Sequence, residues 1–346
     1  MDLEPPEYID SASALESWVA DLRHSQIIAV DTESDSFHHY QEKVCLIQMT
    51  ANGRDVLIDP LAIGSLDVLS PVFADPNRIK IFHDAGYDLV CLARDFGFDF
   101  KGLFDTMLAS RLLGVQRFGL AAVLKEHFDF EADKSQQRSD WARRPLSDKQ
   151  VKYARFDTHF LPRLADLLGQ RLVDCDRLGW AKEDFERLPK IAATVASRSP
   201  ANDPEGFWRI QGLKTQSPEV IGRVRSLYLI RDKMAKRIDR PPFKVFSNKL
   251  ILELAQEPPK TLEQLGPRPG LRRAGVDRFG PEILKALAAA EPFTGKPPRS
   301  SKRRRSGRFM DPIARGRYEA LRELRKSVAS QHSLDPEVML SNACLE

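Results

Sequence analysis

The stretch Ile27-Ile28-Ala29-Val30-Asp31-Thr32-Glu33 decides which fold the sequence predicts. Its apolar run is typical of a buried strand. Side chains alternate between the two faces of a strand, so Asp31 and Glu33 point the same way. The pair is either a solvated strand end or half of a cation site, and the choice depends on partners elsewhere in the chain.

The runs around this stretch predict an α/β domain. Strand-like runs cover residues 26–33, 44–49, 55–59, 79–82 and 101–104, and helical periodicity covers 14–23, 84–96, 106–113, 120–127 and 147–170. The short turn at 51–54 indicates that the first three strands are antiparallel neighbours. Strands followed by alternating helices favour a mixed sheet within a domain that spans residues 1–195.

Polar residues predict where several of these helices begin. Capping boxes are formed by Ser13 with Glu16 and by Ser147 with Gln150, and single N-caps are expected at Asp84 and Asp105. Residues 129–146 are polar and basic without a clear period, so we expect a loop or a short helix over a surface.

The second half of the chain is helical in pattern. After a linker over 196–212, helices are expected at 218–236, 247–255, 262–265 and 281–289, which make a small all-α domain over 213–291. A basic linker follows over 292–312. The last segment, 313–346, contains one more amphipathic helix at 318–330 and reads as a partial helical unit.

Composition places the chain among soluble globular proteins. Of its 346 residues, 42% are hydrophobic and 29% are charged. Apolar runs stay shorter than the ~18 residues of a membrane span, and the acidic start is unlike a signal peptide. Four widely spaced cysteines suggest no disulfide framework, so a cytoplasmic location is expected.

The positive charge is concentrated in one segment. Residues 292–310 carry seven basic and no acidic residues, against a net charge of +4 for the whole chain. Such a segment is expected to touch phosphates or to be a solvated linker.

Further acidic residues are candidate partners for the opening pair. Asp88 lies inside the helix that follows the fourth strand, and Tyr153 and Asp157 are spaced i, i+4 on one face of a later helix. If Asp31, Glu33, Asp88 and Asp157 converge, cations must offset their repulsion. All-oxygen ligation suits two Mg²⁺ or Mn²⁺ ions, which can promote phosphodiester hydrolysis.

These residues resemble a known set of motifs. Asp31-x-Glu33, His83 with Asp88, and Tyr153-x-x-x-Asp157 are similar to the three motifs of the DEDDy 3′–5′ exonucleases, most fully the ribonuclease D family. The resemblance implies an RNase H-like fold and release of 3′ nucleotides as monophosphates. It also implies that the four carboxylates bind two metal ions and that Tyr153 orients the attacking water.

The helical part resembles an HRDC domain, an auxiliary module shared by helicases and ribonuclease D. The similarity rests on Arg231, the Asp239-Arg240-Pro241-Pro242 turn and the run 265–271. The segment 318–340 is similar to the opening of a second such unit. The resemblance implies weak binding or positioning of nucleic acid.

Several polar residues are candidates for binding substrate. The cluster His38, His39 and Tyr40 either stacks on a terminal base or is an exposed turn. His83 either contacts a scissile phosphate or fixes its loop. Three residues of the basic stretch are candidates for contacts with the RNA backbone: Gln136, Arg138 and Arg144.

The resulting hypothesis is a monomeric 3′–5′ exoribonuclease that acts on RNA with a single-stranded 3′ end, with precursor tRNA implied by the family. One alternative is the same chemistry on DNA, since none of the motifs reads a 2′-hydroxyl. The other is a non-catalytic RNA-binding protein on the same fold.

Overall fold

The structure, a computed structural model, describes residues 4–197, 203–267, 269–297, 311–340 and 345. It divides into two compact units. The sheet unit comprises the described residues of 1–35, 43–198 and 304–346, and the helical unit comprises those of 36–42 and 199–303. Most of the basic segment and the start of the predicted interdomain linker lie outside the described residues.

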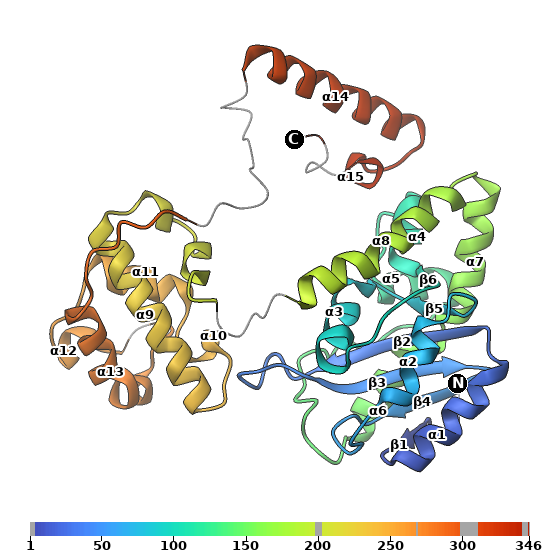
Figure 1. The fold of residues 1–346 in the computed structure, drawn as a ribbon, viewed down its shortest axis with the longest axis horizontal. Coiled ribbons are helices and arrows are strands. Elements are labelled where there is room, and N and C mark those ends of the chain that lie inside the picture. Colours follow the sequence, from blue (N-terminus) through green and yellow to red (C-terminus); the bar gives the residue numbers. More distant parts are fainter. Residues whose placement is uncertain (1–3, 198–202, 268, 298–310, 341–344, 346) are drawn as a thin grey trace. The chain divides into compact units, whose positions relative to one another are not determined.

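The sheet unit is built on six strands in the order β1-β4-β3-β2-β5-β6 (Figure 1). The strands are β1 (Glu7–Ile9), β2 (Ile27–Ser34), β3 (Val44–Ala51), β4 (Arg54–Ile58), β5 (Ile79–Phe82) and β6 (Leu103–Asp105). β2 pairs antiparallel with β3 and parallel with β5, and β3 pairs antiparallel with β4. The predicted mixed sheet is confirmed, and β1 is a strand that the sequence did not predict.

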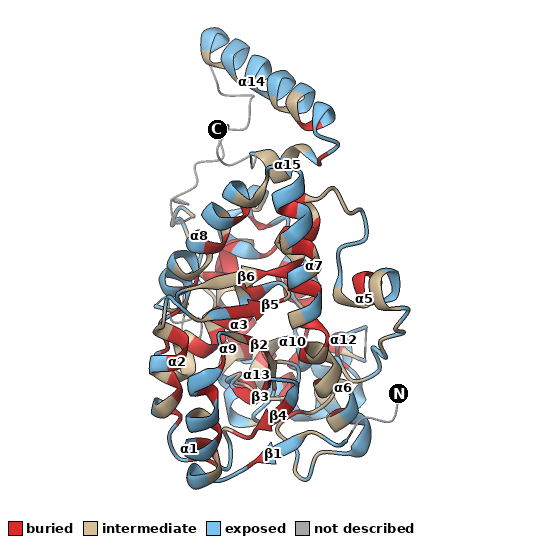
Figure 2. Ribbon diagram, turned by 90° about the vertical axis from the view of Figure 1, so that its right-hand side faces the viewer, coloured by how far each residue is buried: buried red, intermediate tan, exposed pale blue. Residues whose placement is uncertain are grey.

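Helices cover both faces of the sheet, whose strands are largely buried (Figure 2). The helices of this unit are α1 (Ala12–Asp21), α2 (Ser70–Ala74), α3 (Ala85–Phe96), α4 (Thr106–Leu112), α5 (Leu120–Phe128), α6 (Asp148–His159), α7 (Leu161–Asp174), α8 (Leu178–Ala196), α14 (Pro312–Gln331) and α15 (Pro336–Met339). On one face Ile28 and Val30 pack with residues of α1, α2 and α3. On the other face Ala29 packs with α7, and Leu46 packs with Ala154 of α6.

Helix starts differ from two of the predictions. The cap of α1 is Ser11, whose side chain accepts from Ala14 N, so the box predicted at Ser13 is wrong. Asp84 precedes α3 but forms no side-chain cap, because it adopts a left-handed φ of 67°. The capping box of Ser147 and Gln150 is present at α6 as predicted.

Asp105 caps two helices at once. Its carboxylate accepts from Met107 N at 2.8 Å and Leu108 N at 3.0 Å, which caps α4 as predicted. It also accepts from Ala85 N at 2.8 Å and Asp84 N at 3.3 Å, at the start of α3. This buried side chain therefore fixes the start of the helix that carries Asp88.

The helix predicted over 147–170 is two helices. α6 ends at His159 and α7 begins at Leu161, with Pro162 in its first turn. Proline fits a first turn because its missing N–H has no partner there anyway. The break lets α6 cross β2, β3 and β4 while α7 packs beside β5.

The helical unit holds α9 (Pro218–Arg237), α10 (Pro242–Val245), α11 (Asn248–Gln256), α12 (Leu262–Leu265) and α13 (Arg273–Ala288). They share a core that includes Leu227, Leu254 and Ile283. The helix predicted at 281–289 begins earlier, because Pro281 lies inside α13 and not at its start. Among the described residues, no helix is long and apolar enough to cross a membrane.

The last helices return to the sheet unit. Arg177 Nη2 donates to His332 O at 2.7 Å, between α14 and α15, and Val338 packs against the apolar cluster of α4 and α7. The predicted helix at 318–330 falls within α14.

We expect Asp105→Ala to lower the free energy of unfolding by about 2–3 kcal/mol, since two helix starts each lose a cap of roughly 1 kcal/mol. Urea unfolding curves measure the change. Asp84→Asn is the matched control, because Asp84 is the N-cap that the sequence predicts for α3. The free energy of unfolding of this variant should equal or exceed that of the wild type. A larger loss for Asp84→Asn than for Asp105→Ala would contradict the assignment.

Candidate metal centre

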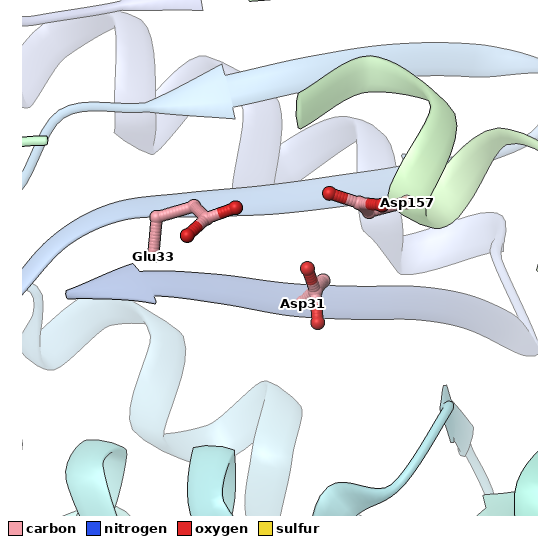
Figure 3. Close-up of side chains that lie close together, drawn as sticks. All are labelled: Asp31, Glu33 and Asp157. Atoms are coloured by element: carbon pink, nitrogen blue, oxygen red, sulfur yellow. The ribbon is translucent and has the colours of Figure 1, made fainter. Parts of the chain in front are cut away.

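Three carboxylates meet over one face of the sheet. Asp31 and Glu33 project from β2 and Asp157 from α6, and Figure 3 shows their carboxylates facing a common space. One oxygen from each lies within 4.8 Å of the other two. The alternation of side chains along β2 thus aligns Asp31 with Glu33, and α6, which crosses the sheet, supplies Asp157.

Asp88 reaches the same region from the first turn of α3. Its carboxylate accepts a short hydrogen bond from the hydroxyl of Thr32, the residue between the two acidic residues of β2. Asp88 lies outside the group of three, but its charge raises the pKa of Asp31 and of Asp157. The sequence pattern did not single out Thr32, because side chains alternate along a strand and Thr32 points to the face opposite that of Asp31 and Glu33.

The gathered carboxylates resist ionisation. Burial, followed by the charges of Asp88, Asp157 and Glu33, raises the pKa of Asp31 well above its ordinary value. Burial and the charges of Asp157 and Asp88 do the same for the pKa of Glu33. Burial raises the pKa of Asp157 to about 8, and the charge of Asp88 adds to the effect. A cation between these groups would restore the ionised forms.

Tyr153 lies one turn before Asp157 on α6, and its phenol is close enough to lower the pKa of the Asp157 carboxyl in part. Burial, followed by the charge of Asp157, raises the pKa of the phenol far above its ordinary value. The hydroxyl therefore stays protonated at neutral pH. Gln137, on the loop before α6, is close enough to the phenol to lower its pKa in part, whereas the sequence pattern favoured its neighbours Gln136 and Arg138.

The donor set fits a hard divalent cation. It consists of carboxylate oxygens alone, which suits Mg²⁺ or Mn²⁺ better than softer metals. In addition, Asp157 Oδ2 is buried without a hydrogen-bond partner among the described residues. An unpartnered buried acceptor beside two other carboxylates is suited to a metal ion.

Known proteins match the chain in both parts. A family described as 3′–5′ exonuclease matches residues 6–173, and the HRDC domain family matches residues 221–287. Ribonuclease D of Jannaschia sp. is 33% identical over 267 residues, which cover 75% of this chain and 68% of the relative. The chain belongs to the ribonuclease D family.

The chain is also similar to a eukaryotic exonuclease and to a solved bacterial structure. The exosome complex exonuclease RRP6 of Saccharomyces cerevisiae is 37% identical over 268 residues, although the chain spans only 36% of its length. The crystal structure of Escherichia coli RNase D, at 23% identity, has a TM-score of 0.73 and covers 97% of this chain and 88% of that one. This likeness confirms the predicted RNase H-like exonuclease fold with a helical HRDC domain.

Arg144 occupies a structural position in this ribonuclease D fold. Its guanidinium donates to Asp59 through Nε at 2.5 Å and Nη2 at 2.8 Å, and to the carbonyls of Trp141, Arg143 and Cys45. All its donors are thus engaged within the protein. The predicted contact of Arg144 with the RNA backbone is not supported, because the side chain ties the loop before α6 to the sheet.

His83 also serves the fold. Its Nδ1 lies 2.9 Å from Thr106 Oγ1, and that hydroxyl donates to Phe82 O at 2.9 Å. Burial lowers the pKa of the imidazole to about 4, so it is neutral near pH 7. Of the two roles considered for His83, the fixing of its own loop agrees with these contacts.

The cluster of His38, His39 and Tyr40 belongs to the helical unit. His39 Nδ1 lies 2.7 Å from Asp239 Oδ2, and the Tyr40 hydroxyl donates to Asp232 at 2.7 Å. These aromatic residues are therefore held by side chains on and just after α9, and the contacts give no support to base stacking.

The remaining candidates lie on the loop before α6. Gln136 donates to Ser135 Oγ at 2.9 Å and accepts from Ser139 Oγ at 2.6 Å, so its amide orders the loop. Arg138 is exposed on the same loop. A backbone contact by Arg138 remains a prediction.

We expect the metal-free protein to lose stability as the pH rises from about 4 toward 8. The raised pKa values of Asp88, about 7, and Asp157, about 8, mean that the folded state binds more protons than the unfolded chain in this window. Thermal unfolding in a chelator at several pH values measures the trend.

The same series with excess Mg²⁺ is the control. The ion should remove most of the slope, because it offsets the charge of the ionised carboxylates. A melting temperature in chelator that rises with pH over this window would contradict the electrostatic account.

Proposed function

We propose that this chain is a metal-dependent 3′–5′ exoribonuclease that hydrolyses phosphodiester bonds from the 3′ end of structured RNA. Membership of the ribonuclease D family supports the reaction class. The observation that carries the proposal is the approach of the Asp31, Glu33 and Asp157 oxygens to within 4.8 Å of one another. The products are nucleoside 5′-monophosphates.

We propose that the metal ligands are the carboxylates of Asp31, Glu33, Asp88 and Asp157. Two Mg²⁺ or Mn²⁺ ions bound there would supply Lewis-acid stabilisation of the attacking and leaving oxygens. Asp31 and Glu33 are aligned by β2, and Thr32 holds the Asp88 carboxylate toward the same region. The protein's part is to hold these oxygens at fixed positions before the ions arrive.

We assign the positioning of the attacking water to Tyr153. In the metal-free protein, burial and the charge of Asp157 raise the pKa of the phenol, so the hydroxyl is present as a protonated hydrogen-bonding group. Its position one helical turn before Asp157 places the phenol beside the carboxylates. A protonated phenol can hold the attacking water by a hydrogen bond, which is the role that the family resemblance implies for this residue.

We propose RNA with a short unpaired 3′ end as the substrate, with precursor tRNA as the physiological case. In this proposal residues 1–195 hold the catalytic site. The HRDC part and the basic segment would hold the folded body of the RNA by shape and phosphate contacts. The protein would act as a monomer in the cytoplasm, where cysteines outside disulfides, such as Cys45 and Cys175, are compatible with a reducing environment.

We expect Asp31→Asn to reduce hydrolysis by at least about 100-fold while RNA affinity changes little, since the amide is a weaker cation ligand of equal size. A digest of 5′-labelled RNA with Mg²⁺ measures the rate, and filter binding in a chelator measures affinity. Near wild-type turnover in this variant would contradict the metal assignment.

We expect Tyr153→Phe to reduce the rate by about 100-fold at saturating RNA, because a misplaced nucleophile loses alignment with the phosphate. Single-turnover kinetics measure the effect. Tyr8→Phe is the control, because the Tyr8 hydroxyl donates to Asp59, which is not one of the four assigned metal ligands. Equal rates for the two variants would refute the role of Tyr153.

The rival functions are separable in the same assays. Matched RNA and DNA substrates with identical 3′ overhangs distinguish a ribonuclease from a deoxyribonuclease, and we expect faster trimming of RNA. Tight RNA binding with no hydrolysis and no Mn²⁺ binding would favour a non-catalytic RNA-binding protein.

A further inference from the structure

Gln48 is a buried polar residue that the described contacts leave without a role. It lies in the middle of β3, in an otherwise apolar run from Cys45 to Met49, and is 0% exposed. Neither Nε2 nor Oε1 of its amide has a hydrogen-bond partner among the described residues. An unpartnered buried amide destabilises a folded protein unless a bound water or ion supplies the partner.

The register of the sheet places Gln48 at the carboxylates. Gln48 is the residue of β3 directly opposite Asp31 of β2. Directly paired residues of an antiparallel ladder point to the same face, with Cβ atoms roughly 4.5–5.5 Å apart. The Gln48 side chain therefore stands on the face that carries Asp31 and Glu33.

The neighbours of Gln48 on β3 confirm that this face is the one beneath α6. Two residues before it, Leu46 packs with Ala154 of α6, and two residues after it, Thr50 Oγ1 lies 2.8 Å from Thr158 Oγ1 of α6. Side chains two apart on a strand share a face. Gln48 thus lies under the stretch of α6 that presents Asp157.

Thr50, the next polar residue on this face of β3, shows how a buried structural side chain here finds hydrogen-bond partners within the protein. The Thr50 hydroxyl, two residues along, has both Asp55 Oδ1 and Thr158 Oγ1 at 2.8 Å. Among the residues that the structure describes, Gln48 has no such partner, and Asp157 Oδ2 in the same cluster is an acceptor without one. The unsatisfied donor and the unsatisfied acceptor both belong to the carboxylate site.

We propose that Gln48 is a positioning residue of the metal centre, whose amide hydrogen-bonds to the ligand carboxylates and to the hydration shell of the bound cation. Nε2 donates to a carboxylate oxygen, and Oε1 accepts a hydrogen from that shell. Partners of this kind hold ligands in the metal-binding orientation. The inference rests on the proposed function, since it assumes that the carboxylates bind a divalent ion.

The test compares Gln48→Met with Thr50→Val in the full-length chain. Calorimetric titration with Mn²⁺ alone gives the affinity, and thermal unfolding in a chelator gives the stability of the metal-free protein. For Gln48→Met we expect Mn²⁺ affinity to fall about 10- to 100-fold with an equal or higher melting temperature. For Thr50→Val we expect the reverse, a lower melting temperature with unchanged affinity.

The rate of RNA hydrolysis provides a second measurement. Raising the Mn²⁺ concentration should restore the rate of Gln48→Met toward that of the wild type, because the residue acts through metal binding.

The outcomes separate this inference from the function on which it rests. Failure of the wild type to bind Mn²⁺ would overturn the proposed function. Wild-type binding with unchanged affinity in Gln48→Met would overturn only the role of Gln48. Gln48→Leu is a second variant of similar volume. If neither variant folds in chelator, the amide stabilises the metal-free protein and the inference is wrong.

Discussion

The fold holds several partly buried carboxylates together against their mutual repulsion. Asp31 and Glu33 lie on a strand and Asp157 on a helix, and 124 positions of sequence separate Glu33 from Asp157. Burial and proximity raise their pKa values, so the metal-free site favours protonated groups. Divalent ions remove this penalty, and in this way the folding of the chain and its chemistry depend on the same interaction.

Much of the sheet unit serves to fix this arrangement. The Arg144–Asp59 pair and the packing of Trp141 with Leu46 and Ala154 anchor the loop that leads into α6. Asp105 fixes the start of α3, and through it the position of Asp88. Arg144, Asp59 and Asp105 are charged residues, yet their hydrogen bonds are with the protein itself.

Two pairs of side chains at the site could be aligned from the sequence because each depends on local periodicity. The alternation of a strand aligns Asp31 with Glu33, and the turn of a helix aligns Tyr153 with Asp157. Partners separated by many residues could not be assigned in this way. Arg144 looked like a phosphate ligand because its carboxylate partner, Asp59, is 85 positions away. Gln48 drew no attention because only the register of β2 and β3 brings it beside Asp31.

The claim that these carboxylates form a divalent metal centre is tested most directly by anomalous diffraction from crystals of the full chain grown with Mn²⁺. The account predicts anomalous peaks at the carboxylates, one of them bounded by Asp31, Glu33 and Asp157 and a second toward Asp88. Well-ordered crystals in which these side chains are clear but no anomalous peak lies among them would contradict it.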